Sequence, residues 1–440
     1  MSLDATERFA PDALQRALAH TRDLLQRVHS RTLNNGARLH ILQDGSHGIA
    51  CLEVWIRVGS GDEPKEKAGI SHLLEHLMFR GTKQHPDGEF DELIEERGVQ
   101  ANAWTWYDTT AYTATLPREA LREVMELETD RLQGLDITQE VFDTEREVVL
   151  NERSLTADSD PNALAQEHLD RMLFEAGPYA HPVIGYRENI AGLTREDILA
   201  WYQTHYAPSA LDIIVTGDID EAQVVEMAEA TFGTLSADRS PAPERPNASG
   251  AVGVGKEERI ELPVAAPSLM IAWPHPKRQQ IQAIATFKVL AELLAWSRGG
   301  ALRDALEYNA QIVLQQNFYL NEHRLGHSAL WEASPREGLS TDALAEHFFE
   351  TMRAFSAEPP SQSAIDAAQL RLLTLLSARS TPWQLARALG GALHDGGALD
   401  SVERDLVALG AVSAADVQSL AKRLAARSNA IILHVLPQKS

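Results

Sequence analysis

The order of apolar and polar positions divides the chain into two halves of similar plan. Apolar runs bounded by turn residues predict strands, and apolar residues that recur every three or four positions predict helices. The Asn35-Gly36 step between two apolar runs predicts a hairpin. The amphipathic segment 11–28 is expected to pack either on the body of the protein or on a partner chain. The expected strands of the first half are 31–33, 37–42, 48–59, 99–106, 109–116 and 211–216, and its expected helices include 88–97, 117–133, 138–155, 160–174, 194–206 and 220–233.

A segment rich in Pro, Ala, Ser and Gly, residues 236–256, separates the halves and is interpreted as a linker. We predict an α+β fold of two tandem homologous domains, each a mainly antiparallel sheet packed with helices. The predicted boundaries are a helical extension 1–28, a first domain 29–235, the linker, and a second domain 257–440. The second domain is expected to hold strands at 259–262, 268–273, 313–320, 328–332 and 430–436, and helices at 279–297, 340–356, 361–378, 381–389 and 413–427.

Charge and composition narrow the classes of ligand and location. The chain has 63 acidic and 40 basic side chains, a net charge of −23. This disfavours nucleic acids and anionic membranes, whose binding needs basic surface, and is compatible with cationic peptides. Solubility alone explains the negative charge at least as well. No apolar run is long enough for a membrane helix, and residues 1–20 lack the apolar core of a signal peptide. Cys51 is the only cysteine and is expected to be a buried strand residue, which fits the cytoplasm, with the periplasm as the alternative if a leader was removed.

The stretch with the clearest chemical content is His72-Leu73-Leu74-Glu75-His76. Two histidines four residues apart lie on one face of a helix, one turn apart, so both imidazoles can reach one metal ion. Glu75 directly precedes the second histidine and is placed to take a proton from a water molecule beside that ion. The order H-x-x-E-H is that of the inverzincins.

An ordinary surface helix with exposed histidines is the alternative interpretation of this motif. The residues around the motif are largely apolar, so the helix is expected to be buried. They are Ile70, Leu73, Leu74, Leu77, Met78 and Phe79. A buried carboxylate and two imidazoles are costly unless they are paired or bound to a metal. The local pattern therefore favours a metal site.

A second acidic face lies in the expected helix 138–155. Glu145, Val148, Val149 and Glu152 have the spacing of one helix face. Two valines predict that this face points into the core, where two carboxylates need a cation nearby. On this basis we assign Glu152 as a third metal ligand and Glu145 as an auxiliary acid. A helix face in water explains the same spacing equally well, so the spacing alone leaves both interpretations open.

Residues 69–82, with H-x-x-E-H followed by Phe79-Arg80-Gly81-Thr82, resemble the pitrilysin-type metallopeptidases, in the branch of the mitochondrial processing peptidases and their bacterial relatives. In that family the third zinc ligand is a glutamate about 76 residues after the second histidine, which corresponds to Glu152. An additional family acid seven residues earlier corresponds to Glu145. Segments 100–105, 179–185 and 214–219 resemble further family segments, so the resemblance covers about residues 30–235.

The resemblance implies a zinc endopeptidase with one Zn²⁺ per chain. His72, His76 and Glu152 would be the metal ligands, with the fourth coordination position left for water. Glu75 would be the catalytic base that activates this water and passes the proton to the leaving amine. Glu145 would be an auxiliary acid of the catalytic site.

The resemblance also implies where a peptide substrate binds. The peptide would add as a strand to the sheet edge formed by Asn102, Ala103, Trp104 and Thr105, with main-chain pairing that demands little of the substrate sequence. Trp104 or Trp106 is expected to line a side-chain pocket. Plain sheet packing is the alternative for both tryptophans, and it is favoured slightly for Trp106.

The second half has no equivalent motif. His323 and His327 are four residues apart but no glutamate takes the motif position, so they are not expected to bind metal. Pitrilysin-type enzymes usually carry an Arg and a Tyr here that grip the substrate. Arg303 matches the Arg, but Ala310 stands at the expected Tyr position and Tyr308 is out of place.

This departure predicts a division of labour between two chains. We expect this chain to be the zinc-bearing member of a heterodimer with a zinc-less homologous subunit, the two enclosing a chamber around the peptide. A homodimer is the alternative assembly. The alternative from another functional class is a non-catalytic structural or binding subunit of a larger complex, although such family members have usually lost the motif that is complete here.

Overall fold

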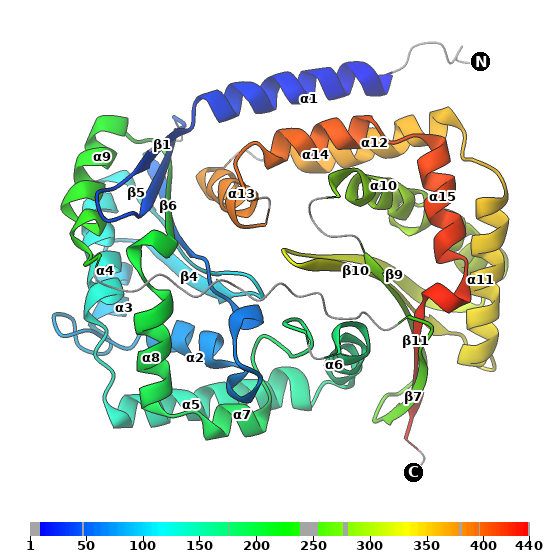
Figure 1. Ribbon diagram of the computed structural model, residues 1–440, viewed down its shortest axis with the longest axis horizontal. Helices are drawn as coiled ribbons and strands as arrows, with labels where there is room; N and C mark the ends of the chain where they lie inside the picture. The colour runs from blue at the N-terminus through cyan, green and yellow to red at the C-terminus, as the bar shows by residue number, and fades with distance from the viewer. Residues whose placement is uncertain are drawn as a thin grey trace.

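The computed structural model describes residues 9–45, 48–175, 177–237, 254–275, 280–377, 381–395 and 397–438. Two sheets lie in separate halves of the molecule, each lined by helices (Figure 1). Strands between residues 29 and 217 build the first sheet, and strands between 257 and 437 build the second. The predicted fold of two tandem sheet-and-helix halves is therefore confirmed. Most of the expected linker lies outside the described residues, and the domain boundaries stay a prediction.

The first sheet has six strands in the order β1-β2-β6-β3-β5-β4. All neighbouring pairs are antiparallel except β2 and β6. The predicted hairpin joins β1 to β2, and Gly36 in its turn has a φ of +92°, a conformation that suits glycine. Among the described residues, β4 has no neighbour beyond β5 and is an edge strand. The strands are β1 (His29–Thr32), β2 (Arg38–Gln43), β3 (Ile49–Ile56), β4 (Gln100–Thr105), β5 (Thr110–Pro117) and β6 (Leu211–Gly217).

The helices of the first half, apart from α6, bury their apolar faces against one side of this sheet. Leu73, Leu74 and Leu77 of α2 are fully buried in one core with Val54 and Ile56 of β3. The sequence pattern predicts these helices except α7, which at six residues is too short to show a period. They are α2 (Ile70–Leu77), α3 (Glu89–Glu96), α4 (Leu121–Gly134), α5 (Gln139–Arg153), α6 (Pro161–Phe174), α7 (Arg187–Gly192), α8 (Arg195–His205) and α9 (Glu221–Ala230).

The second sheet has five strands in the order β7-β11-β8-β10-β9, with only β7 and β11 parallel. The predicted helix 279–297 is α10 followed by a π-helical turn, Glu292–Trp296, and α14 was not predicted. The strands are β7 (Glu257–Leu262), β8 (Ser268–His275), β9 (Val313–His323), β10 (Gly326–Pro335) and β11 (Ile431–Pro437). The helices are α10 (Ile281–Ala291), α11 (Thr341–Ala357), α12 (Gln362–Ser377), α13 (Pro382–His394), α14 (Ser401–Gly410) and α15 (Ala414–Leu424).

The two halves exchange a helix. α13 belongs to the second half by sequence, yet its Leu385 and Leu389 form a core cluster with Cys51 and Trp55 of the first sheet. In return, α6 of the first half packs on β8, β10 and β11 of the second sheet. A Cβ at Gly390 of α13 would lie 2.1 Å from the Trp55 ring, so only glycine permits this approach. Cys51 is buried in its strand as predicted, and burial raises the pKa of its thiol to about 12.

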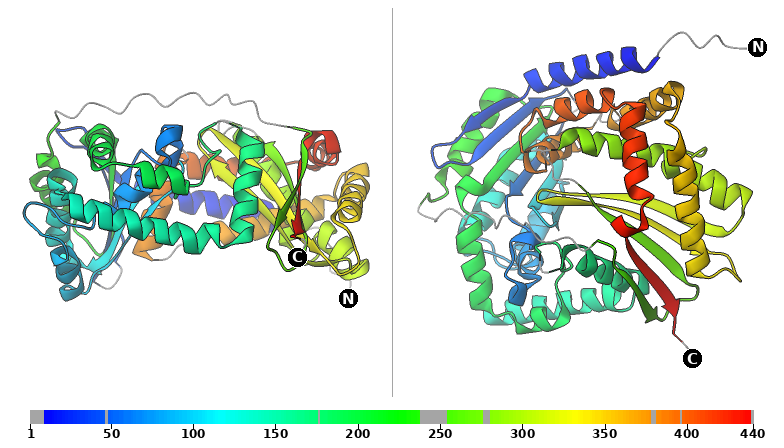
Figure 2. Two further views of the ribbon diagram at one scale, coloured as in Figure 1. Left: turned by 90° about the horizontal axis from the view of Figure 1, so that it is seen from below. Right: turned by 45° about the vertical axis from the view of Figure 1, so that its right-hand side comes forward.

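Helix α1 (Phe9–Gln26) runs along one side of the molecule from the first half to the second (Figures 1 and 2). Leu14 and Leu18 pack against the core of the second half, and Arg22 pairs with Glu403 of α14 at 2.7 Å. Of the two expectations for this segment, packing on the body of the protein is the one observed. No helix among the described residues has both the length and the apolar character needed to cross a membrane.

Candidate functional site

The helix that carries the H-x-x-E-H motif starts at an anchor that the sequence reasoning missed. Gly69, before α2, has a φ of +97°, and a Cβ there would lie 2.5 Å from the carbonyl oxygen of Ile184. The buried carboxylate of Glu63 accepts hydrogen bonds from the N–H groups of Gly69 at 2.7 Å and Ser71 at 2.8 Å. A carboxylate here satisfies free N–H groups and complements the helix dipole. The start of α2 is therefore fixed, and with it the direction of the motif side chains.

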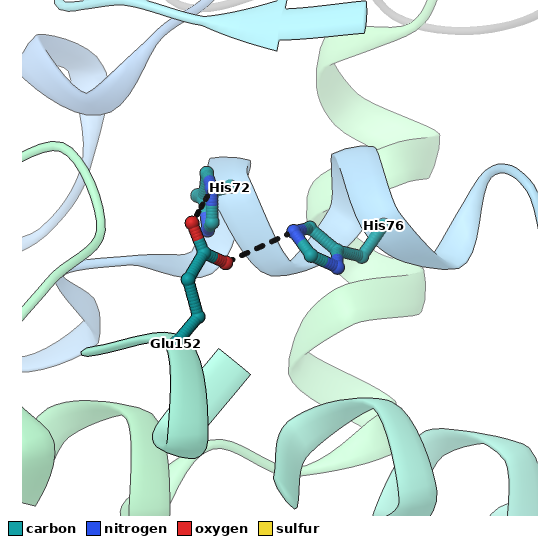
Figure 3. A group of neighbouring side chains, drawn as sticks. All are labelled: His72, His76 and Glu152. Atoms are coloured by element: carbon teal, nitrogen blue, oxygen red, sulfur yellow. Dashed lines mark ion pairs between the residues drawn. The ribbon is translucent and has the colours of Figure 1, made fainter. Parts of the chain in front are cut away.

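Helices α2 and α5 bring the three predicted metal ligands together (Figure 3). The His72 and His76 rings lie one helical turn apart with centroids 4.8 Å from each other. The Nε2 atom of His72 is 3.8 Å from one carboxylate oxygen of Glu152, and that of His76 is 3.4 Å from the other. One ring nitrogen of His72, one ring nitrogen of His76 and one carboxylate oxygen of Glu152 lie within 4.8 Å of one another. The three side chains thus surround a single point.

The face of α5 that points at α2 is narrower than expected. Glu145 and Val149 are buried and Glu152 is partly buried, as a core-facing stripe requires. Val148, however, is 41% exposed, so the expectation that both valines point into the core is wrong. The stripe that faces α2 consists of Glu145, Val149 and Glu152, at positions i, i+4 and i+7. Val148, at position i+3, lies outside this contact.

Glu145 lies behind the predicted metal ligands. It is 2% exposed, and one of its carboxylate oxygens is 3.5 Å from Nδ1 of His76 while the other is 2.8 Å from Nε of Arg80. A carboxylate behind a metal-binding histidine fixes the orientation and tautomer of the ring and makes it a stronger ligand. The sequence reasoning gave Arg80 no role, although it follows the motif directly.

The protonation of the two histidines differs because their neighbours differ. Burial and the nearby His76 lower the pKa of His72 to about 4, so this ring is neutral at pH 7. Burial also lowers the pKa of His76, but hydrogen bonds with Glu145 and Glu152 outweigh it and raise the pKa to about 9. The hydrogen bond with His76 is the main cause that lowers the pKa of Glu152.

Glu75 lies beside the predicted metal ligands and contacts the edge strand. The hydroxyl of Thr105 in β4 donates a hydrogen bond to its carboxylate at 2.6 Å. Burial raises the pKa of Glu75, and the hydrogen bond from Thr105 counteracts part of that effect. A raised pKa makes the carboxylate a stronger base, which suits it to accept a proton from water and to return it. Thr105 was predicted to bind substrate, and its contact with Glu75 was not foreseen.

The residues present fit a zinc ion. Two imidazoles and one carboxylate form a ligand set that catalytic zinc commonly uses. Glu75, Glu145 and Glu152 place three carboxylates around two imidazoles, and Arg80 pairs with Glu145 and with Asp87. Such an excess of acid in a partly buried cluster is stabilised by a divalent cation.

The predicted substrate strand lies at the edge of the first sheet. The N–H of Trp106 donates to the carbonyl of Thr109 at 2.8 Å, so alternation along the strand directs the N–H groups of Ala103 and Thr105 away from β5. The N–H of Ala103 donates to the side-chain oxygen of Asn102 at 2.8 Å. The outward backbone groups next to Glu75 are therefore available for another strand to pair with.

The two tryptophans of this segment lie differently from what was favoured. Trp104 packs on the back of the sheet, where its ring lies 5.4 Å from that of Trp55, rather than lining a pocket beside the metal ligands. Trp106 is 51% exposed, so the slight preference for sheet packing at this position is wrong. The strand ends at Thr105, and the strand alternation that would bury the Trp106 ring ends with it.

Two family models match the chain in succession. The model described as insulinase, peptidase family M16, matches residues 40–187, and the model described as peptidase M16 inactive domain matches residues 192–372. Together they extend over most of the chain. The chain belongs to the peptidase M16 family.

Curated M16 relatives from bacteria and mitochondria match the chain. The zinc protease PqqE of Helicobacter pylori is 30% identical over 50% of this chain and 50% of its own length. A mitochondrial-processing peptidase subunit beta of Lentinula edodes is 25% identical over 78% of this chain and 68% of its own. Subunit 1 of the cytochrome b-c1 complex of Rattus norvegicus is 30% identical over 46% and 43%. The chain thus spans about half the length of several curated relatives it matches.

Solved M16 structures share the fold. A protease from Helicobacter pylori superposes with a TM-score of 0.82 at 21% identity, covering 93% of this chain and 99% of that one. The periplasmic protease PqqL from Escherichia coli gives a TM-score of 0.79 at 18% identity, covering 94% of this chain and 48% of that one.

The contacts described for the second-half residues that the sequence singled out are not with the motif residues. The guanidinium of Arg303 donates to the carbonyl of Ala295 at 2.6 Å within its own half. Tyr308 is 49% exposed. His323 is buried among the aromatic rings of Tyr107 and Tyr179, at 4.8 and 4.6 Å, and the side chain of its proposed companion His327 lies outside those described.

Proposed function

We propose that this protein is a zinc metalloendopeptidase that hydrolyses peptides or unfolded protein segments, and that it is the zinc-bearing subunit of a two-subunit chamber. One observation carries the proposal. The Nε2 atoms of His72 and His76 face the carboxylate of Glu152, which comes from a helix far along the chain. Membership of the M16 family and relatives named as zinc proteases support the same reading.

The residues of the site have separate roles in this reaction. His72, His76 and Glu152 would hold the zinc ion, which when bound supplies Lewis acidity toward water and a peptide carbonyl. Glu75 accepts the proton of the attacking water and returns it to the leaving amine, so no proton is gained or lost overall. Thr105 holds the Glu75 carboxylate in place through its hydroxyl group.

The substrate is proposed to be an extended peptide paired with β4. The outward N–H and C=O groups of Ala103 and Thr105 offer main-chain hydrogen bonds next to Glu75. The Asn102 side chain, which now accepts the N–H of Ala103, would give way to the substrate carbonyl. The net charge of −23 supports a preference for basic peptides through long-range attraction.

The replacement Glu75→Gln tests the chemistry. It keeps the size of the side chain but removes the base, so cleavage of an internally quenched peptide is expected to fall by a factor of about 10² to 10⁴, while bound zinc stays at one per chain. Glu95→Gln, on the exposed face of α3, is the matched control and should cleave like the wild type. Unchanged cleavage by Glu75→Gln would remove Glu75 from the mechanism.

Two subunits are proposed to enclose the chamber. In fold, this chain covers 92% of the structure of the first half of PqqL and 48% of the longer PqqL chain, which supports a chamber built from more than one such unit. We propose a zinc-less homologous subunit as the partner, with a homodimer as the alternative. The isolated chain should cleave weakly and gain activity when the partner is added. Full activity at the mass of a monomer in light scattering would contradict this.

For the cellular compartment, the cytoplasm stays the first expectation and the periplasm the second.

A non-catalytic subunit is the second candidate function, favoured by the similarity to a cytochrome b-c1 complex subunit. The complete motif and the converging ligands argue against it, because a purely structural role requires neither Glu75 nor the approach of Glu152 to both histidines. Metal analysis together with the Glu75→Gln assay separates the two functions. A non-catalytic subunit would show no cleavage in the wild type.

A further inference from the structure

We propose that Arg387, from the second half of the chain, is a positioning residue for the peptide-binding edge. It acts through Trp104, which it holds against the back of the first sheet. This inference rests on the proposed function and assigns part of substrate binding to the half that carries no zinc ligand. Three features of the described residues support it: the row of side chains behind β4, the stacking of Arg387, and the strand positions on either side of Trp104.

Three neighbouring strands place Trp55, Ala111 and Trp104 in one row across the sheet. Ala111 of β5 is the register partner of both Trp55 in β3 and Trp104 in β4. Because alanine is small, the two indoles meet over it edge to face, with centroids 5.4 Å apart and planes at 80°. Within the first sheet, Trp55 is therefore the aromatic neighbour described for Trp104.

Arg387 closes this row from α13. Its guanidinium carbon is 3.4 Å from the centroid of the Trp104 ring and 5.3 Å from that of Trp55. A cation over an indole face is attracted by the ring, and the attraction grows when water is excluded. Glu53, fully buried beside Trp55, accepts a hydrogen bond from the Trp55 indole N–H at 2.6 Å. Burial raises the pKa of its carboxyl group, and the charge of Arg387 opposes part of that rise. The stack is thus part of a buried charged and aromatic layer.

The position of α13 is itself tightly set. Gly390 sits against the Trp55 ring, where any Cβ would collide with it, and the Thr216 hydroxyl of β6 donates to the carbonyl of Pro382 at 2.6 Å. Arg387 therefore projects from a helix that is packed directly on the sheet. Because α13 is held on the sheet, its packing also limits where the Arg387 guanidinium can lie.

The consequence lies on the other side of β4. Ala103 and Thr105, which flank Trp104 in the strand, present their backbone groups to the edge, and Thr105 also holds Glu75. An edge strand is paired on one side only, so its position depends strongly on what packs behind it. Fixing Trp104 therefore fixes the two residues that would pair with a peptide. The metal ligands, on α2 and α5, are not among the contacts of Arg387 that the structure shows.

The test compares Arg387→Ala with Arg371→Ala in the full chain. Arg371, another second-half arginine, pairs with the buried Glu292, and its helix α12 packs in the core of the second half. For an internally quenched decapeptide containing Arg and Leu, Arg387→Ala is expected to raise KM about tenfold, close to 1.4 kcal/mol, with kcat changed less than twofold. Arg387→Lys, which keeps the charge but not the planar stack, should recover part of this loss. Zinc content should not change.

Hydrogen–deuterium exchange of segment 100–106 provides a measurement that does not depend on cleavage. Arg387→Ala should speed exchange there, while Arg371→Ala leaves it as in the wild type. If the wild type cleaves the peptide but both variants share its KM and exchange, the role of Arg387 is overturned and the peptidase proposal stands. If the wild type does not cleave, the peptidase proposal fails, and the exchange of 100–106 alone decides whether Arg387 anchors β4.

Discussion

Replacing Glu145 by alanine should weaken zinc binding without unfolding the protein. Glu145 is the carboxylate 3.5 Å from Nδ1 of His76, and its removal leaves this nitrogen without the group that orients the ring. Loss of such a partner typically costs about 10-fold to 100-fold in metal affinity, or about 1.4 to 2.7 kcal/mol. The free energy of unfolding should change less than the zinc affinity. Without Glu145 the Arg80 guanidinium loses this carboxylate partner, but the Arg80 side chain is 37% exposed and water can solvate its charge.

Zinc affinity is measured by competition with a chelating dye at pH 7.5, and thermal unfolding is followed on the zinc-free protein. Glu145→Gln should lie between the alanine variant and the wild type, because the amide can still accept a hydrogen bond but carries no charge. Glu147→Ala, at an exposed position two residues further along α5, is the control and should match the wild type in both measurements. A zinc affinity in Glu145→Ala within twofold of the wild type would refute the assignment of Glu145 as the orienting group.

Two further predictions concern the contact between α13 and the first sheet. Gly390→Ala should destabilise the protein by about 1 to 3 kcal/mol through overpacking, because its Cβ would lie 2.1 Å from the Trp55 ring. At Gly391 the nearest atom to a Cβ is 3.7 Å away, so alanine there should be neutral or stabilising. Equal melting temperatures for the two variants would contradict the close packing of Gly390. Burial raises the pKa of Glu53 from 4.5 to about 7. The folded state then holds a proton that the unfolded state releases, so stability should fall as the pH rises from about 4.5 through 7, by about 3 kcal/mol in all. Urea unfolding at pH 5 and pH 8 should show a smaller fall for Glu53→Gln than for the wild type, and parallel falls would show that Glu53 ionises normally.

Local signals were sufficient to predict the parts of the site that lie within one helix. The spacing of His72, Glu75 and His76 determines a shared face of α2 whatever the rest of the fold does. The spacing of Glu145 and Glu152 also predicted a shared face of α5, although it left open whether that face met α2 or water. Only the packing of the two helices decides between these interpretations, and no local pattern encodes it.

Long-range contacts explain what the sequence did not predict. Arg387 stacks on Trp104 across a very large separation in the chain, and α13 reads as an ordinary helix of the second half. Glu63 precedes the N–H group it caps by six residues, outside the range of the usual capping patterns. Trp106 follows a strand whose end could not be located to the residue, so its exposure could not be foreseen.

The most direct test of the account is the zinc content of the purified protein and of Glu152→Ala, measured by mass spectrometry after gel filtration and supported by X-ray absorption at the zinc edge. We expect one zinc per wild-type chain, with two nitrogen ligands at about 2.0 to 2.1 Å and carboxylate oxygen at about 2.0 to 2.2 Å, and a large loss of zinc in Glu152→Ala. A wild-type chain that binds no zinc, or a variant that retains it with the same affinity and spectrum, would contradict it.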